Sequence, residues 1–205
     1  MMFTRELTRR CTISGMFAGL FAGAVGLPSP ALALTESEAS RLVGALVGEI
    51  NAVIDSGKSE SAMYRDFERI FSRYSDTSYI AAYTLGNDGR RASSAQKRAY
   101  SDAFEGYVAR KYGKRFREFI GGRLEVTGVK KVKRWYEVSC VAHLRGEAPF
   151  EVTFLVSDRG GQPLFFNLYI EGINMLLTER TEVGAMLDRR RGDIDKLVAD
   201  LRTAG

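Results

Sequence analysis

The sequence is poor in the residues that carry most enzyme chemistry. Its 205 residues include one histidine, His143, two cysteines, one tryptophan and four prolines. It has no GxSxG, no HExxH, no cysteine cluster, no Walker-type loop and no Rossmann glycine fingerprint. These absences exclude the familiar nucleophile, metal and nucleotide sites. His143 remains a candidate base, and folding could bring the carboxylate of Glu171 or Asp158 near it.

The first 33 residues have the order of segments found in a secretory signal peptide. A basic start containing Arg9 and Arg10 precedes a glycine-rich apolar stretch, residues 11–27, and the triplet Ala31-Leu32-Ala33 follows. The arginine pair suits twin-arginine export, and Sec export remains open. The sequence therefore predicts a cleaved signal peptide over residues 1–33, an exported protein and a mature domain over residues 34–205.

The mature chain has a mild charge and a single cysteine. Residues 1–33 hold three of the 30 basic and one of the 25 acidic residues, so the mature domain has a net charge of +3. No arginine-rich patch is interleaved with stacking aromatics, so no nucleic-acid partner is expected. Cys140 is the only cysteine left, which excludes an intramolecular disulfide. Its apolar neighbours favour a buried thiol.

The period of the hydrophobic residues changes along the mature chain. Helical spacing comes first and alternation follows, with short connections typical of hairpins. Expected helices cover residues 36–56, 61–76, 77–86 and 94–119, and expected strands cover residues 123–132, 133–144, 149–158 and 163–172. Two further helices follow, from about Asn174 to Arg190 and after Asp193. The predicted fold class is α+β, with helices wrapped around a curved antiparallel sheet of about four strands.

The fourth expected strand is apolar on both faces. Phe166, Leu168 and Ile170 share one face, while Phe165 and Tyr169 occupy the other. The strand then breaks near a glycine at position 172 and runs into a helix. This excess of apolar side chains is typical of an ordinary core or of the wall of an apolar cavity between sheet and helices.

Four stretches carry a resemblance to a known family. They are residues 63–76, 79–86, 93–116 and, most strongly, 167–201, which reads NLYIEGINMLLTERTEVGAMLDRRRGDIDKLVADL. In order and spacing the mature chain resembles the MlaC-type family of periplasmic phospholipid-binding proteins, also called toluene-tolerance or ABC-transporter auxiliary proteins. The family pattern is matched at Glu171, Gly172, Ile173 and Arg180. Asn167, Asn174 and Glu179 stand where aspartate, serine and tyrosine are usual.

The resemblance implies a lipid carrier and not an enzyme. Such a protein shuttles phospholipid between an outer-membrane lipoprotein complex and an inner-membrane Mla-type ABC transporter complex, and so maintains outer-membrane lipid asymmetry. It implies a phospholipid ligand, a monomer, and no metal or cofactor. The acyl chains would be held in the apolar cavity.

The residues expected to line that cavity come from the long helix, two strands and the strand–helix junction. They are Phe104, Tyr107, Val138, Cys140, Phe154, Val156, Phe166, Leu168, Ile170, Ile173 and Leu176. Asn174 and Arg180 are candidates for contact with a headgroup or a partner.

Two alternatives from other classes remain open on the residues alone. A small-molecule enzyme with a cupped fold similar to ketosteroid isomerases predicts a polar pocket that contains His143. A structural or adaptor protein of the cell envelope predicts a filled core with no cavity.

Overall fold

The structure is a computed structural model that describes residues 34–113 and 122–205. The predicted signal peptide, residues 1–33, lies outside the described residues. So do Phe116 and Phe119, which were expected to extend the apolar stripe of the long helix.

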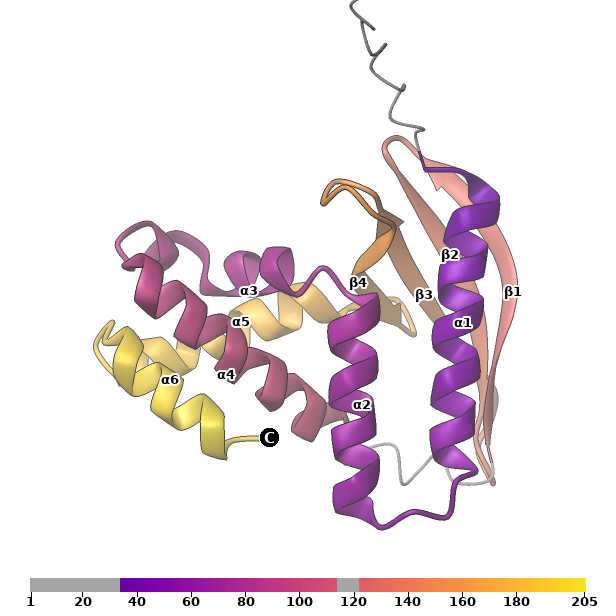
Figure 1. Cartoon of the computed structure of the whole chain (residues 1–205), viewed down its shortest axis with the longest axis horizontal. Coiled ribbons are helices and arrows are strands. Elements are labelled where there is room, and N and C mark those ends of the chain that lie inside the picture. Colours follow the sequence, from indigo (N-terminus) through magenta and orange to yellow (C-terminus); the bar gives the residue numbers. More distant parts are fainter. Residues whose placement is uncertain (1–33, 114–121) are drawn as a thin grey trace, which may run out of the picture. The chain divides into compact units, whose positions relative to one another are not determined.

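The described residues form helices first, then a meander of strands, then helices (Figure 1). The helices are α1 (Glu36–Ile54), α2 (Glu60–Tyr74), α3 (Thr77–Leu85), the 3-10 helix η1 (Gly86–Arg90), α4 (Ser94–Gly113), α5 (Met175–Arg189) and α6 (Ile194–Thr203). The strands are β1 (Arg123–Val132), β2 (Trp135–His143), β3 (Phe150–Ser157), β4 (Leu164–Ile170) and β5 (Ile173–Asn174). The α+β prediction is confirmed, and η1 and β5 are additions to it.

Side-chain caps explain where several helices begin. Thr35 Oγ1 accepts a hydrogen bond from the backbone N–H of Glu38, whose carboxylate accepts one from the N–H of Thr35, so a capping box starts α1. Helices α3, α5 and α6 each begin with a single side-chain oxygen, of Asp76, Asn174 and Asp193, that accepts a hydrogen bond from a backbone N–H of the first turn. Each of these capping residues lies directly before its helix, so the sequence itself marks where the helix begins.

The strands form one antiparallel sheet in the order β1-β2-β3-β4-β5. The first four strands pair as successive hairpins, as the short connections predict. The fifth is a two-residue strand that folds back on β4 after a tight turn. Glu171 and Gly172 form this turn with φ values of 49° and 77°. Two-residue hairpin loops of the primed types need positive φ at such positions, and glycine adopts it without strain.

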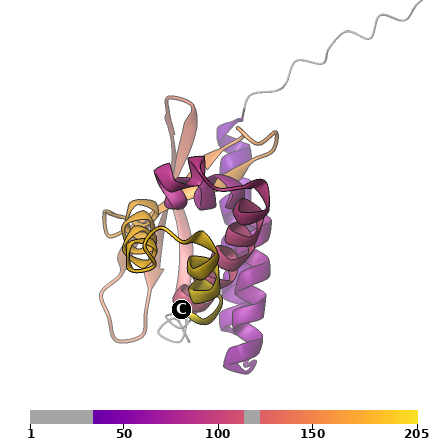
Figure 2. The same ribbon diagram turned by 90° about the vertical axis from the view of Figure 1, so that its left-hand side faces the viewer.

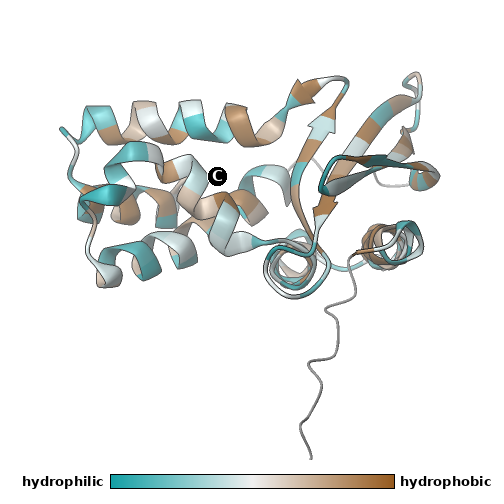
Figure 3. Ribbon diagram, turned by 90° about the horizontal axis from the view of Figure 1, so that it is seen from above, coloured by the Kyte–Doolittle hydropathy of each residue, from teal (hydrophilic) through white to brown (hydrophobic). Residues whose placement is uncertain are grey.

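The helices cover the sheet in two groups. Helix α1 lies along β1, β2 and β3, and α2 runs antiparallel beside it (Figure 1). Helices α3, α4, α5 and α6 form the second group, with α3 against α5 and α4 against α6. This second group faces the viewer in Figure 2. Seen from above in Figure 3, α1 and α2 are viewed nearly end-on beside the strands, and α5 leads away from them.

The most tightly packed part of the core joins α4 to its neighbours. Tyr100 and Phe104 on α4 and Leu197 and Leu201 on α6 are all but inaccessible to solvent. The hydroxyl of Tyr100 forms a 2.8 Å hydrogen bond with Thr84 Oγ1 on α3, so its polar atom is satisfied inside the core. Helix α4 is thereby fixed on one side, and its other side is free to face the sheet.

Candidate functional site

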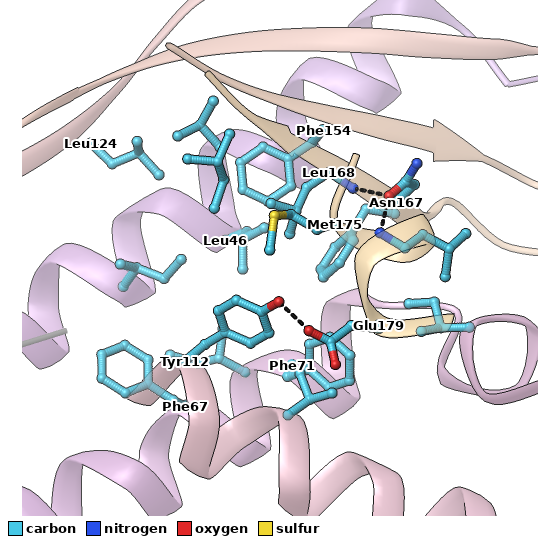
Figure 4. A pocket seen from close by; sticks show the side chains of 18 of the residues that line it. Leu46, Phe67, Phe71, Tyr112, Leu124, Phe154, Asn167, Leu168, Met175 and Glu179 are labelled. Atoms are coloured by element: carbon cyan, nitrogen blue, oxygen red, sulfur yellow. Dashed lines mark hydrogen bonds between the residues drawn. The ribbon is translucent and has the colours of Figure 1, made fainter. Parts of the chain in front are cut away.

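A cavity of about 560 Å³ lies between the sheet and the helices. The helices contribute Leu46, Ile50, Phe67, Ile70, Phe71, Ile80, Phe104, Val108, Ala109, Tyr112, Met175, Leu176 and Glu179. The strands and their loops contribute Leu124, Leu144, Glu147, Ala148, Phe150, Val152, Phe154, Phe165, Phe166, Asn167, Leu168, Ile170 and Glu171. Except for three glutamates and one asparagine, these residues are hydrophobic. Figure 4 shows that side chains from both layers converge on this space.

An irregularity in β4 turns the ring of Phe165 toward the cavity. Asn167 pairs with Leu155 of β3, but the next pairing joins Phe165 to Val156, so Phe166 is an extra residue in β4. Such a bulge interrupts the alternation of side chains. Strict alternation had placed Phe165 on the face opposite to Phe166. That expectation is wrong for Phe165, whose ring packs against the lining residues Phe71 and Phe154. The ring of Phe166 packs instead against Tyr79 and Trp135, which are not lining residues.

Six of the eleven residues predicted to line the cavity do so. They are Phe104, Phe154, Phe166, Leu168, Ile170 and Leu176. Five come from the strands and the strand–helix junction, where the sequence shows the largest excess of apolar side chains. Phe154 and Leu168 are direct cross-strand partners, so their side chains lie together in the sheet wall.

The other five predicted residues are placed elsewhere. Val138, Cys140 and Val156 are completely buried, but none is among the lining residues. Burial raises the pKa of the Cys140 thiol to about 12, so the thiol is protonated and unreactive in the folded protein. Tyr107 points toward α5, where its hydroxyl donates to Glu182 at 3.0 Å. Ile173 is 59% exposed in the turn before α5.

The polar residues at the strand–helix junction are engaged in holding it. Asn167 Oδ1 accepts hydrogen bonds from the N–H groups of Leu168 and Leu176 at 2.8 and 3.0 Å, and its Nδ2 donates to Asn174 Oδ1 at 3.0 Å. Asn174 also caps α5 by accepting from the N–H of Leu177. Asn167 is a buried clamp that fixes the start of α5 against β4.

Arg180, the second candidate for headgroup contact, joins two helices. Its guanidinium donates to the backbone oxygen of Tyr83 at 3.0 Å and lies 5.0 Å from the centre of the Tyr83 ring. It also packs closely against Gly86. These contacts tie α5 to the end of α3.

One wall of the cavity contains a partly buried ionic cluster, in which only Glu179 is buried. Lys111 donates to Glu179 Oε1 at 2.7 Å and to Glu182 Oε2 at 2.5 Å, and the hydroxyl of Tyr112 also donates to Glu179 Oε1 (Figure 4). Burial and then the Glu179 charge raise the pKa of Tyr112 far above its ordinary value, so its hydroxyl stays a donor. Burial alone would raise the pKa of Glu182, but hydrogen bonds from Lys111 and Tyr107 lower it.

The cluster joins α4 to α5, and the burial of the Glu179 carboxylate carries a cost in lost hydration. Glu179 is 4% exposed, and its Oε2 atom is buried with no hydrogen-bond partner among residues 34–113 and 122–205. A buried charge needs its partners to offset the loss of water. Lys111 is therefore a structural partner of Glu179, and the cluster holds two helices of the cavity wall together. Sequence reasoning had not connected these residues, because they lie 68 positions apart.

The residues suggested for acid–base chemistry are not brought together. His143 lies at the end of β2 with its Nε2 atom 3.8 Å from Glu125 Oε2, and it is not a lining residue. Glu171 lies in the β4–β5 turn at the cavity. Asp158 accepts a hydrogen bond from the backbone N–H of Leu34. The structure therefore does not bring His143 to the apolar cavity that Glu171 borders.

Most lining residues from the helices were missed by sequence reasoning. Leu46 and Ile50 of α1 and Phe67, Ile70 and Phe71 of α2 lie in regular apolar stripes. The same stripes also form the ordinary core, so periodicity marks the inward face without separating core from cavity. The stripes were the available signal, and it is not specific.

Neither a metal site nor a membrane span is found in the part of the chain that the structure describes. No group of three or more histidine, cysteine, aspartate or glutamate side chains is arranged to hold a metal ion there. No described helix combines the length and the apolar character needed to cross a bilayer.

Fold and cavity together define a class of small α+β proteins with an internal apolar binding cavity. The family description "MlaC protein" matches residues 45–203, which is most of the chain. The chain therefore belongs to the MlaC family, as the resemblance predicted.

A solved structure shows the same fold. It is a phospholipid-binding protein from Ralstonia solanacearum in complex with a phospholipid, with a TM-score of 0.67 and 15% sequence identity. The match covers 80% of this chain and 98% of that protein. No curated protein matches the sequence.

Proposed function

We propose that this protein binds phospholipid and carries it through the periplasm. The observation that carries the proposal is the cavity of about 560 Å³ with an almost wholly hydrophobic lining, in a member of the MlaC family. The match in fold to a protein solved with a bound phospholipid supports the same ligand class. Ligand pockets in proteins span about 300–1,000 Å³, so the cavity has the size of a binding site.

The physical need for such a cavity follows from the hydrocarbon chains. Each methylene held out of water contributes about 0.8 kcal/mol, so a lipid with about 30 methylenes resists leaving a membrane by roughly 24 kcal/mol. A carrier must replace the membrane with an equally apolar surface. The rings of Phe71, Phe154 and Phe165, which pack against one another, supply part of that surface in this cavity.

The further steps of the proposal concern location and partners. The chain is exported by the signal peptide of residues 1–33, and it exchanges lipid with an outer-membrane lipoprotein complex and an inner-membrane ABC transporter complex of the Mla type. Ile173 and Leu177, which are 59% and 52% exposed, lie beside the lining residues Met175 and Leu176. Two exposed apolar side chains next to a cavity are suited to transient contact with such complexes.

The cavity also separates this proposal from its alternatives. An adaptor protein with a filled core leaves the cavity without a purpose. An enzyme of similar fold needs polar groups that converge on a substrate. His143 instead lies outside the cavity. In the ion pairs of the described residues, the only carboxylate that pairs with His143 is that of Glu125, at 3.8 Å. Lipid carriage uses the cavity as it is.

The experiment that tests the proposal is native mass spectrometry of the protein purified from the periplasm, followed by organic extraction. We expect one phospholipid for each protein molecule. A protein that is empty after purification, and still empty after incubation with phospholipid vesicles, would refute lipid carriage. Transfer between donor and acceptor vesicles, measured with and without the protein, then tests carriage separately from binding.

A further inference from the structure

The described structure begins with a residue that is already fixed in place. The side chain of Leu34 is only 7% exposed and belongs to the hydrophobic core. Its backbone nitrogen donates a 2.9 Å hydrogen bond to Asp158 Oδ2, a residue 124 positions away, just after β3. Leu34 is also the residue that follows the triplet Ala31-Leu32-Ala33.

The surroundings of this nitrogen are acidic. Thr35, the next residue, donates its N–H to Glu38 Oε2 at 2.8 Å, so the first two nitrogens are each held by a carboxylate. Glu36 also lies in the first turn of α1, and the charges of Arg41 and Asp158 both act on Glu38. A positive charge at a helix N-terminus is normally unfavourable, because it meets the positive end of the helix dipole. Here the carboxylates of Asp158 and Glu38 offset that penalty.

We propose that the Ala33–Leu34 bond is the processing site and that the new α-ammonium of Leu34 forms an ion pair with Asp158. Hydrolysis of this bond by a signal peptidase adds one water, leaves the carboxylate on Ala33 and converts the Leu34 amide nitrogen into an ammonium. The hydrogen bond from a neutral amide to the Asp158 carboxylate thereby becomes an ion pair in which both groups are charged. The domain is thus stabilised at its first residue by the same cleavage that releases it.

This proposal predicts that the stability of the folded protein depends on pH in the range between the ordinary pKa values of histidine and lysine. An α-amino group ordinarily titrates near pH 7.7–8.0, histidine near 6.5, and lysine and tyrosine above 10. The chain has one histidine, and burial moves the pKa of Cys140 to about 12. An ammonium that gains a carboxylate partner has its folded pKa raised. Its stabilisation is therefore complete below about pH 7.5 and is lost as the pH rises through the folded pKa.

The test compares the mature protein with one variant and one matched control. Intact mass of the periplasmic protein should correspond to residues 34–205. Its melting temperature should fall by about 2–4 °C between pH 7 and pH 9, as expected for an interaction of about 1 kcal/mol in a domain of this size. Asp158→Asn keeps an acceptor for the nitrogen but removes the charge, so its melting temperature should not fall in this window.

The control is Asp88→Asn, which removes an exposed carboxylate paired with Arg91 in η1. It should keep the pH dependence of the wild type. A mature protein that begins at any residue other than Leu34 would overturn the proposal, and this mass measurement needs no variant. The same decline in Asp158→Asn as in the wild type, or no decline in the wild type, would overturn the ion pair.

Discussion

The wall assignment of Leu168 gives the sharpest test of the cavity. Leu168 lies on β4, opposite Phe154, and it is partly buried while it lines the cavity. In the proposed complex an acyl chain covers this side chain. We expect Leu168→Asp to leave the lipid-free protein folded, because the new carboxylate can still be hydrated from the cavity. The same change should greatly weaken lipid binding.

The size of the effect follows from the protonation of the new aspartate. A carboxylate covered by hydrocarbon avoids ionisation by binding a proton. Because pH 7 lies about 3 units above the ordinary aspartate pKa of about 3.9, protonating the carboxylate at pH 7 costs roughly 4 kcal/mol. Affinity should therefore fall by about a thousandfold at pH 7. Because the cost is set by protonation, affinity should recover about tenfold for each pH unit down to about pH 4.

Equilibrium binding of a fluorescent phospholipid between pH 4.5 and pH 7 measures both quantities. Leu168→Asn, which carries no charge, should lose less affinity and show no recovery at low pH. Leu177→Asp makes the same chemical change at an exposed leucine of α5 and should bind as the wild type does. Wild-type affinity in a folded Leu168→Asp protein, or an affinity that ignores pH, would refute the reasoning.

Three further predictions concern stability and reactivity. Cys140 should resist alkylation in the native protein and react within minutes in denaturant; rapid native labelling would show that it is accessible. Gly184→Ala, where an added Cβ meets nothing, should stabilise by up to about 1 kcal/mol, whereas Gly172→Ala at φ 77° should destabilise by about 1–2 kcal/mol in denaturant titrations. Hydrogen bonds from Lys58 lower the pKa of Asp66, so this contribution is complete above about pH 4 and is lost below it. Asp66→Asn should lower the free energy of unfolding by about 1 kcal/mol at pH 7 and should remove part of the stability that the wild type loses in acid. An equal loss at pH 7 and below about pH 4 would contradict this.

Local sequence signals determined most of the secondary structure. The start of α5 illustrates this, because Asn174 sits where a cap is needed and the apolar spacing changes period there. The strand β2 is equally direct, since buried and half-buried residues alternate along its whole length. Such signals depend on contacts between residues that are close in sequence, so they can be read without knowing the fold.

The cavity residues were predicted less completely, because a pattern identifies a face and not what lies opposite it. Val138 and Cys140 alternate correctly along β2, yet they are completely buried and do not line the cavity. Leu168 and Ile170 on β4 also follow their pattern, and these two do line it. Where helices stand away from the sheet is set by the packing of whole elements against one another.

The sequence alone determined the order of elements, the fold class and the family to which the chain belongs. The tertiary structure decided three things: which apolar residues border empty space, the bulge at Phe166 that turns the ring of Phe165 toward the cavity, and the pairing of Lys111 with Glu179. The physical reason is the distance along the chain over which each kind of interaction acts. Helix caps and side-chain periods act over a few residues, whereas a cavity and a buried ion pair depend on surfaces that meet only after the chain has folded.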